Sequence, residues 1–445
     1  MKKYFLFPLI AMLFLTSAPL KAQFTLSGEI REKAQLMDGY KLLRDSTKVP
    51  FGLVVQRSRI NLDYQKDKLT FALSVQDVRA WGQNSTSDYN NNVGIFEAWA
   101  KYNFTDNCSV KFGRQQIKYD DERLICASNW TDWGVTHDLA LLQYDNKTTA
   151  TKVDLGLAMN NDSYSIYYLD LYNVKSYKYM SYLWLNRKFV NNKLDVSLMS
   201  LMDVNQRTAQ LNHFENRYTI GPNINYKTDK FKVGGIFYYQ TGALADGRDV
   251  KAMFYSANAA YRFCKHLELM VAYDHYSGTD FSDTTAVKTK STSFDKLYGS
   301  NHTFLGYMDH FLGTNSDITN GAGINDIYAR LNITPKVNHN FEITVHSLSL
   351  DKEYLPTKLS LPVSPFTPIV NKCYQLDKQL AYEFDFVYTY SPSKEINLSL
   401  GYCFMRRYNT LEYLNKISQS NSKFPQYAYL MVTFKPIFFT NSTAK

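Results

Sequence analysis

Residues 380–390 read LAYEFDFVYTY, and this stretch decides the fold. Leu380 and the aromatic residues alternate in it with smaller or charged residues, among them Glu383 and Asp385. Successive side chains of a β-strand point to opposite faces, so the pattern gives one apolar and one polar face. Such a segment is typical of a strand that meets lipid on one side and water on the other.

The same alternation recurs from Phe24 to Phe434, and residues 267–274 are a second clear case. Helical spacing is nearly absent, and after residue 20 no apolar run approaches the roughly 18 residues of a membrane-spanning helix. Tyr and Phe, with 35 and 28 residues, cluster at both ends of the apolar faces, where a barrel has its aromatic girdles. The sequence therefore predicts an all-β, transmembrane, antiparallel up-and-down β-barrel.

The composition excludes several other classes of protein. Of the 445 residues, 20 are Gly and 12 are Pro, which is too few for a collagen-like or low-complexity chain. The formal charge of +9 is mild and spread along the chain, so nucleic acid is not predicted as a partner. No stretch rich in Pro, Gly or charge marks a domain boundary. We expect a single barrel domain, residues 23–445.

Residues 1–22 have the pattern of a secretory signal peptide. Lys2 and Lys3 precede an apolar stretch, and Ala22 is a small residue before the expected cleavage site. Removal of this segment takes three lysines with it and lowers the formal charge from +9 to +6. The five cysteines have no CxxC or Cys/His metal spacing, so isolated cysteines are the preferred interpretation.

Short and long connections alternate along almost the whole chain. The short ones suit tight polar turns, and the long ones suit surface loops. The short segments are 65–68, 105–107, 145–148, 190–192, 227–230, 264–266, 334–339 and 391–395. The longer segments include 34–53, 120–138, 160–176, 278–323, 351–378 and 408–425.

Eight short turns interleaved with nine longer loops predict 18 strands, with short periplasmic turns and long extracellular loops. Sixteen strands also remain compatible with the sequence, because residues 139–144 are short and residues 177–189 alternate poorly. A barrel of either size leaves an aqueous lumen. Conduction is therefore the expected function.

Charged side chains are expected on the inward face, because an outward Arg or Lys at the bilayer midplane costs roughly 2 to 4 kcal/mol. Neither sign dominates, which suits a transverse field that orients solutes as well as a wall stiffened by ion pairs. The phase of the alternation slips at residues 76–77 and 113–114, and a bulge would account for it. The residues expected to line the channel are Arg57, Arg59, Glu97, Lys101, Lys111, Lys152, Asp154, Arg217, Lys232, Arg262, Asp274, Asp326, Arg330, Glu383 and Asp385.

Three segments resemble the alginate-export family of outer-membrane porins, in the branch found in Bacteroidetes-type bacteria. They are residues 73–82 (LSVQDVRAWG), 112–138 (beginning FGRQQIKYDDERL) and 297–311 (LYGSNHTFLGYMDHF). Residues 433–436 (TFKP) also resemble the last strand of that family. The residues that carry the resemblance are Gln76, Asp77, Arg79, Trp81, Gly113, Arg114, Gln115, Asp120, Asp121, Arg123, Trp130, Gly134, Asp138, Tyr298, Gly299, His302, Gly306 and Asp309.

The resemblance covers essentially the whole mature chain and implies a monomeric barrel of 18 strands. The best-known member of the family exports an anionic polysaccharide through an electropositive lumen. Here the expected lumen charges are mixed, and Val135 stands where much of the family has a basic residue. We expect passive, selective passage of a polar or anionic small solute or a saccharide. The expected partners are outer-membrane lipid and the barrel-assembly machinery, and no cofactor is predicted.

Two loop clusters have residue types that also bind metal ions. Residues 120–122 (DDE) could hold Ca²⁺, but a loop anchor paired with Arg123 is the preferred interpretation. His302, Asp309 and His310 match no compact metal motif, and folding of the loop into the pore is preferred for them. No metal site is predicted.

Two other loop features bear on transport. The loop of residues 278–323 is long enough to plug the pore and is the best candidate for a gate. Trp130 and Trp133 suit sugar stacking, and interface anchoring or loop packing is an interpretation at least as well supported.

Two other classes of protein share part of the pattern. A secreted adhesin or carbohydrate-binding sandwich would also have alternating strands and many aromatic residues. A barrel enzyme would need a nucleophile with an oriented base, and the sequence has no GxSxG motif. We therefore predict a non-enzymatic channel.

Overall fold

The computed structural model describes residues 22–83, 92–161, 176–207, 213–280, 286–300, 302–311, 319, 321–353, 377–417 and 423–441. Residues 1–21 of the expected signal peptide and Cys373 lie outside these ranges. The two helices within them are short, α2 (Ala286–Thr289) and α3 (Asn409–Leu414). No helix in the described part of the chain is long and apolar enough to cross a membrane.

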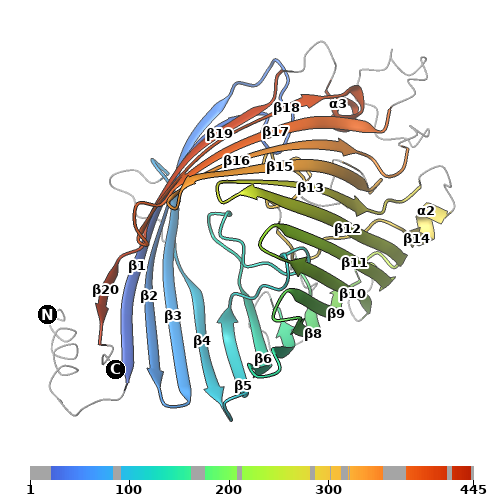
Figure 1. Ribbon diagram of the computed structural model, residues 1–445. Coiled ribbons are helices and arrows are strands. Elements are labelled where there is room, and N and C mark those ends of the chain that lie inside the picture. The colour runs from blue at the N-terminus through green and yellow to red at the C-terminus, as the bar shows by residue number, and fades with distance from the viewer. Residues whose placement is uncertain are drawn as a thin grey trace, which may run out of the picture.

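Eighteen strands form the wall of a closed antiparallel barrel, as predicted (Figure 1). The wall strands are β1 (Gln23–Asp38), β2 (Phe51–Lys66), β3 (Leu69–Ala80), β4 (Val93–Asn103), β5 (Cys108–Gln115), β6 (His137–Asn146), β7 (Thr151–Met159), β8 (Tyr179–Phe189), β9 (Leu194–Gln206), β10 (Phe214–Lys227), β11 (Phe231–Ala243), β12 (Asp249–Cys264), β13 (Leu267–Tyr276), β15 (Ile324–Lys336), β16 (His339–Ser349), β17 (Gln379–Tyr390), β18 (Ile396–Arg407) and β19 (Gln426–Phe434). Two short strands, β14 (Lys290–Ser291) and β20 (Ile437–Thr440), are additions to this wall.

The first and last wall strands close the ring. Antiparallel partners run from Ile30 with Phe434 to Asp38 with Gln426. The start of β1 pairs with β20 instead, because Pro436 has no N–H and interrupts the ladder between β19 and β20. Closure leaves no unpaired strand edge in the lipid, and the closed sheet excludes the two-sheet sandwich of an adhesin.

The eight predicted short turns all connect adjacent wall strands. Residues 139–144 lie in β6, and all of residues 177–189 except the first two form β8, so the 16-strand alternative is wrong. The loop expected at residues 34–53 is shorter than predicted, because β1 extends to Asp38 and β2 begins at Phe51. The side chains of Lys33 and Gln35 continue the inward alternation of β1 and extend its ladder.

The apolar face of the strands points outward. On β13, Val271 is 53% exposed, whereas Ala272 and Asp274 on the inward face are buried. Other exposed apolar residues of the outward face include Ile60, Phe112, Leu157, Ile220, Phe237 and Leu400. This ring of apolar side chains is the surface that lipid covers.

A β-bulge lies near the first of the two slips in the sequence pattern. The register between β3 and β4 shifts opposite Phe96, which is the extra residue on β4. Gln76 is buried on the inward face of β3, whereas Asp77 and Arg79 lie on its outward face. At the second slip, Gly113 has a φ of +116°, and a Cβ there would lie 2.2 Å from a backbone oxygen of β4.

Replacing Val271 with Arg is expected to lower the free energy of unfolding by about 2 to 4 kcal/mol, because the new charge would face hydrocarbon. Val337→Arg is the matched control, since Val337 is fully exposed in the turn between β15 and β16. Urea unfolding in lipid vesicles, followed by tryptophan fluorescence, measures both variants. Equal stability of the two would contradict the outward, lipid-facing placement of β13 side chains.

Candidate functional site in the barrel lumen

Two long loops meet inside the barrel. We call residues 116–136, between β5 and β6, loop A, and residues 292–300 and 302–311, between β13 and β15, loop B. Ile125 of loop A and Tyr298 of loop B form a parallel β-bridge. The Tyr298 N–H donates to a loop A carbonyl at 3.0 Å, and the Tyr298 carbonyl accepts from a loop A N–H at 3.1 Å. Backbone hydrogen bonds therefore join the two loops directly.

An aromatic stack adds a second link between the loops. The rings of Trp130 and His302 are parallel within 1°, with centroids 3.6 Å apart. His302 also stacks on Tyr307 at 4.5 Å, and its Nδ1 lies 2.9 Å from Asp309 Oδ1. Lys33 Nζ of β1 lies over the Trp130 ring, 4.7 Å from its centroid. Trp130 thus packs between loop B and the wall, which is the loop-packing role weighed against sugar stacking.

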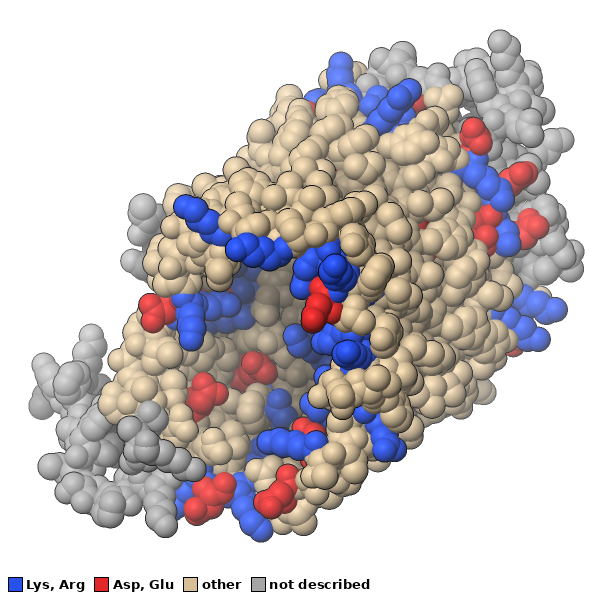
Figure 2. Space-filling model, viewed as in Figure 1, with Lys and Arg blue, Asp and Glu red and all other residues tan. Residues whose placement is uncertain are grey.

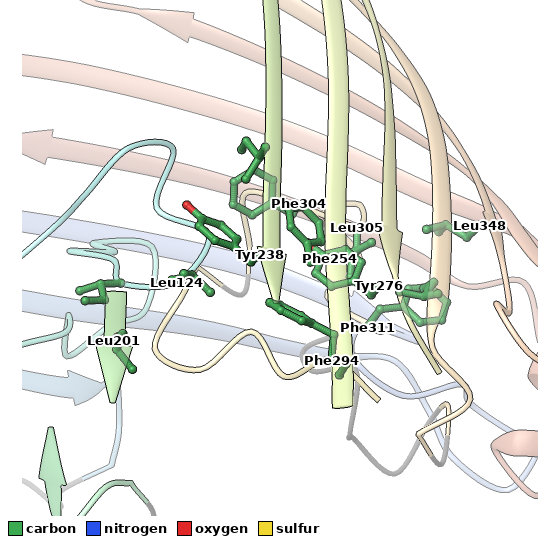
Figure 3. Close-up of a cluster of buried hydrophobic side chains, with 14 of the residues drawn as sticks. Leu124, Leu201, Tyr238, Phe254, Tyr276, Phe294, Phe304, Leu305, Phe311 and Leu348 are labelled. Atoms are coloured by element: carbon green, nitrogen blue, oxygen red, sulfur yellow. The ribbon is translucent and has the colours of Figure 1, made fainter. Parts of the chain in front are cut away.

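An apolar cluster fixes both loops to the wall (Figure 3). Loop A contributes Leu124, and loop B contributes Phe294, Phe304, Leu305 and Phe311. The wall contributes Leu201, Tyr238, Phe254, Tyr276 and Leu348, from β9, β11, β12, β13 and β16. Burying one such side chain stabilises by about 1.5 to 3 kcal/mol. Barrel size alone predicted an aqueous lumen, and these loops instead build a packed core in part of it.

Loop B also binds carboxylates of β17. Met308 N–H donates to Glu383 Oε1 at 2.6 Å, and Tyr307 N–H donates to Asp385 Oδ2 at 3.3 Å. Gly306 begins this turn with a φ of +85°, and a Cβ there would lie 2.3 Å from the Glu383 carboxyl group. The close approach of loop B to the wall therefore requires glycine at position 306.

Four cations on β1 and β2 form a basic wall beside loop A. They are Arg31, Lys33, Arg57 and Arg59. Their side chains are 2% to 6% exposed. Arg57 pairs with Glu29 at 2.5 Å, and Arg59 Nε donates to Gln76 Oε1 at 2.8 Å. Backbone carbonyls of loop A and the Asp132 carboxylate accept further hydrogen bonds from this wall.

Four carboxylates on β13, β15 and β17 form an acidic wall. They are Asp274, Asp326, Glu383 and Asp385, each at most 1% exposed. His346 of β16 lies among them, 2.8 Å from Asp326 Oδ2 and 3.5 Å from Asp385 Oδ2. Arg123 of loop A reaches Asp274 at 2.6 Å. Loop A therefore supplies a cation to the acidic wall and a carboxylate to the basic wall.

A hollow opens at the end of the barrel that carries the short turns, and Lys and Arg side chains surround its mouth, with Asp and Glu side chains among them (Figure 2). We call it the vestibule. Two cavities of about 320 and 310 Å³ share Lys152 and Trp184 in their lining. Lys101, which lines the larger cavity, is the direct antiparallel partner of Lys111. Lys111 Nζ lies 3.9 Å from the centroid of the Trp99 ring.

The structure places all of the expected channel-lining residues on the inward face. Those at least partly exposed are Glu97, Lys101, Lys111, Lys152, Lys232, Arg262 and Arg330. Those that are buried are Arg57, Arg59, Asp154, Arg217, Asp274, Asp326, Glu383 and Asp385. The second group meets loop residues or neighbouring wall side chains, because the loops fold inward over part of the wall. Asp154 of this group also lines the larger cavity of the vestibule.

Most residues that carry the family resemblance lie in loops A and B or contact these loops. They are Gln76, Asp120, Asp121, Arg123, Trp130, Gly134, Tyr298, Gly299, His302, Gly306 and Asp309. Gln115, in contrast, ends β5, and its side-chain amide donates to the Gly113 and Leu139 carbonyls of the wall. Among them, Asp121 pairs with Arg123 at 3.0 Å. Two outward ion pairs account for four more, Asp77 with Arg79 at 2.7 Å and Arg114 with Asp138 at 2.8 Å. Trp81 is 62% exposed where β3 ends, and Gly113 lies on β5.

Sequence reasoning did not select Arg31, Lys33, Asp132 or Lys296. The alternation of β1 places Arg31 and Lys33 inward and could have found them. Asp132 and Lys296 lie in loops, where the sequence has no alternation that would predict which way a side chain points. Burial of Lys296 inside the lumen lowers its pKa to about 8, and its Nζ donates to a loop B carbonyl at 3.3 Å.

Residues 23–412 match the family model for alginate export. The chain belongs to this family. No curated protein matches the sequence. Among solved structures, Pseudomonas aeruginosa OpdO is similar with a TM-score of 0.59 at 13% identity, covering 94% of this chain and 98% of that one. Acinetobacter baumannii OccAB4 is similar with a TM-score of 0.59 at 10% identity and the same two coverages.

A third similar structure is the BenF-like porin from Pseudomonas fluorescens Pf-5, with a TM-score of 0.58 at 9% identity. The match covers 93% of this chain and 99% of the BenF-like porin. At such identities the likeness establishes the fold. Family membership together with the closed 18-stranded wall makes this alginate-export family protein an outer-membrane channel and not an enzyme.

Replacing Gly306 with Val is expected to release loop B from β17, because the new side chain would overlap the Glu383 carboxyl group. A positive φ alone costs about 1 to 3 kcal/mol for a residue with a side chain. Single-channel conductance in planar bilayers should therefore increase. Gly82→Val is the matched control, since Gly82 has a φ of +77° and no atom within 4 Å of a built Cβ. Equal conductance of the two variants would contradict a restricting role of loop B.

Proposed function

We propose that this outer-membrane channel gives passive, selective passage to polar solutes and prefers anions. The observation that carries the proposal is the pair of adjacent inward lysines in the open vestibule, Lys101 and Lys111. Glu97 is an inward carboxylate on the same strand, β4. The larger cavity is lined by four lysines and by three aspartates, Asp106, Asp145 and Asp154. An anion that enters the vestibule meets an excess of positive charge here, before it reaches the loops.

The two charged walls support selectivity deeper in the lumen. The basic wall lies on β1 and β2, and the acidic wall lies on β13, β15 and β17. Only β18 and β19 separate these two sectors around the ring. Opposite charges in neighbouring sectors set a field across the lumen, which would orient a dipolar solute as it passes.

A saccharide is a second candidate solute, favoured by the surroundings of Trp184. Its indole N–H donates to Asp120 Oδ1 at 3.1 Å, and its ring lines both cavities of the vestibule. Asn186, Asn223 and Asn225 line the smaller cavity beside it. An aromatic face with amide groups around it suits the apolar ring face and the hydroxyl groups of a sugar.

The chain closes its barrel without a second copy, so we propose a monomer. β1 and β19 of one chain complete the ring. Residue 23 begins β1, which is consistent with the proposed removal of residues 1–22 and with one barrel domain over the remainder. Assembly into the membrane by the barrel-assembly machinery remains part of this proposal.

The double substitution Lys101→Gln with Lys111→Gln is expected to lower the anion-to-cation permeability ratio about threefold or more. The physical reason is the loss of two positive charges from the lumen surface. Reversal potentials in a KCl gradient across planar bilayers measure this ratio.

Lys251→Gln is the matched control for charge removal, because Lys251 lies on the outward face of β12. It should leave the reversal potential unchanged. A wild-type channel without anion preference, or a double variant that keeps the wild-type ratio, would contradict the proposed selectivity.

A further inference from the structure

Asp132 of loop A occupies the centre of the basic wall. Its Oδ1 lies 2.9 Å from Arg31 Nη2 and 2.8 Å from Lys33 Nζ. The side chains of both cations are 4% exposed, whereas that of Asp132 is 27% exposed. One carboxylate oxygen therefore bridges two buried cations from the side that faces the lumen.

Asp132 does not use all the hydrogen-bond donors of the Arg31 guanidinium group. Arginine binds carboxylates best through two parallel hydrogen bonds. Here the Asp132 carboxylate engages Nη2 of Arg31, while Arg31 Nε is buried and has no hydrogen-bond partner among the described residues. Loop A satisfies other donors of this wall, since Arg31 Nη1 donates to the Asn129 carbonyl and Arg59 Nη1 donates to Asn129 Oδ1 at 3.1 Å. Arg57 Nη1, in contrast, has only long contacts with loop A, at 3.4 to 3.5 Å from three carbonyls. The basic wall is thus incompletely satisfied by the protein itself.

The charges of this wall do not balance. It holds four cations, and the carboxylates of the described residues within ion-pair distance of them are Glu29 and Asp132. Glu29 lies on β1 and also pairs with Lys435 at 3.4 Å. Asp132, in contrast, lies on a loop and can leave without disturbing a strand. Buried cations without partners are costly, so a departing Asp132 must be replaced by another anion.

From this geometry we propose that Arg31 and Lys33 form a binding site for a carboxylate group of the solute, and that Asp132 is its internal competitor. A solute carboxylate takes the place of the Asp132 carboxylate and can also reach the unused Nε of Arg31. Loop A then moves away from β1 at residue 132. This inference rests on the proposed anion passage and adds to it a specific subsite and the residue that guards it.

Asp132→Asn tests the competition, because it keeps the side-chain shape and removes its charge. Glucuronate is the probe, and glucose is its uncharged counterpart of similar size. Titration calorimetry of the full chain in detergent micelles measures glucuronate affinity directly. We expect the dissociation constant for glucuronate to fall about tenfold in Asp132→Asn. Arg31→Gln, in contrast, should abolish glucuronate binding.

Asp138→Asn is the matched control, because Asp138 makes an ion pair with Arg114 on the outward face, with both side chains nearly half exposed. It should bind glucuronate as the wild type does. Heat-modifiable gel mobility shows that each variant is a folded barrel. Unchanged glucuronate affinity in Asp132→Asn would overturn the proposal, as would an equal gain in affinity for glucose.

Ion currents measured on the same samples separate this inference from the proposed function. If the wild-type protein binds glucuronate but conducts no anions, the carboxylate subsite is supported and the proposed anion passage is contradicted. If the protein conducts anions but its glucuronate affinity does not change in Asp132→Asn, anion passage is supported and the role of Asp132 is overturned. In liposome swelling, faster glucose entry through Asp132→Asn without tighter glucuronate binding would mean that the substitution only loosens loop A, which also overturns it.

Discussion

The constraint behind this structure is that backbone N–H and C=O groups cannot stay unpaired in hydrocarbon. Each strand must therefore have two neighbours, and the ring must close. The pairing of β1 with β19 satisfies this condition along Ile30 to Asp38, and β20 extends it along the start of β1. Once the ring is closed, every second side chain faces either lipid or the interior, and the loops are left as the segments that can enter the lumen.

Entry of the loops changes the electrostatics of the interior. Charges placed inward to avoid lipid become buried once loops A and B cover them, and a buried charge needs a partner. Loop A supplies Arg123 to Asp274 on the acidic wall and Asp132 to Arg31 on the basic wall. The same loop thus satisfies charges in two sectors of the ring. A movement of loop A would expose unpaired charge in both, which couples its position to the ions in the lumen.

Backbone geometry decides how closely the loops can approach the wall. Gly306 allows loop B to place two N–H groups on Glu383 and Asp385 without a side chain between them. Tyr298 joins loop B to loop A through its backbone, so that the apolar cluster of Figure 3 holds both loops together. The vestibule, in contrast, keeps its lysines open to water. The lumen therefore has a wet part, lined by lysines and carboxylates, and a packed part.

The sequence by itself determined the barrel, its eight short turns and the inward direction of residues such as Lys101 and Asp385, because a period of two is a local property of the chain. It left 16 strands open beside 18, and the structure decided for 18. It also determined where Arg31 and Lys33 point, although that signal was overlooked. Only the tertiary structure decided that loops A and B fill part of the lumen, and that Asp132 meets Arg31 and Gly306 meets Glu383. Loops have no period, and these contacts join residues far apart in the sequence, so nothing local specifies them.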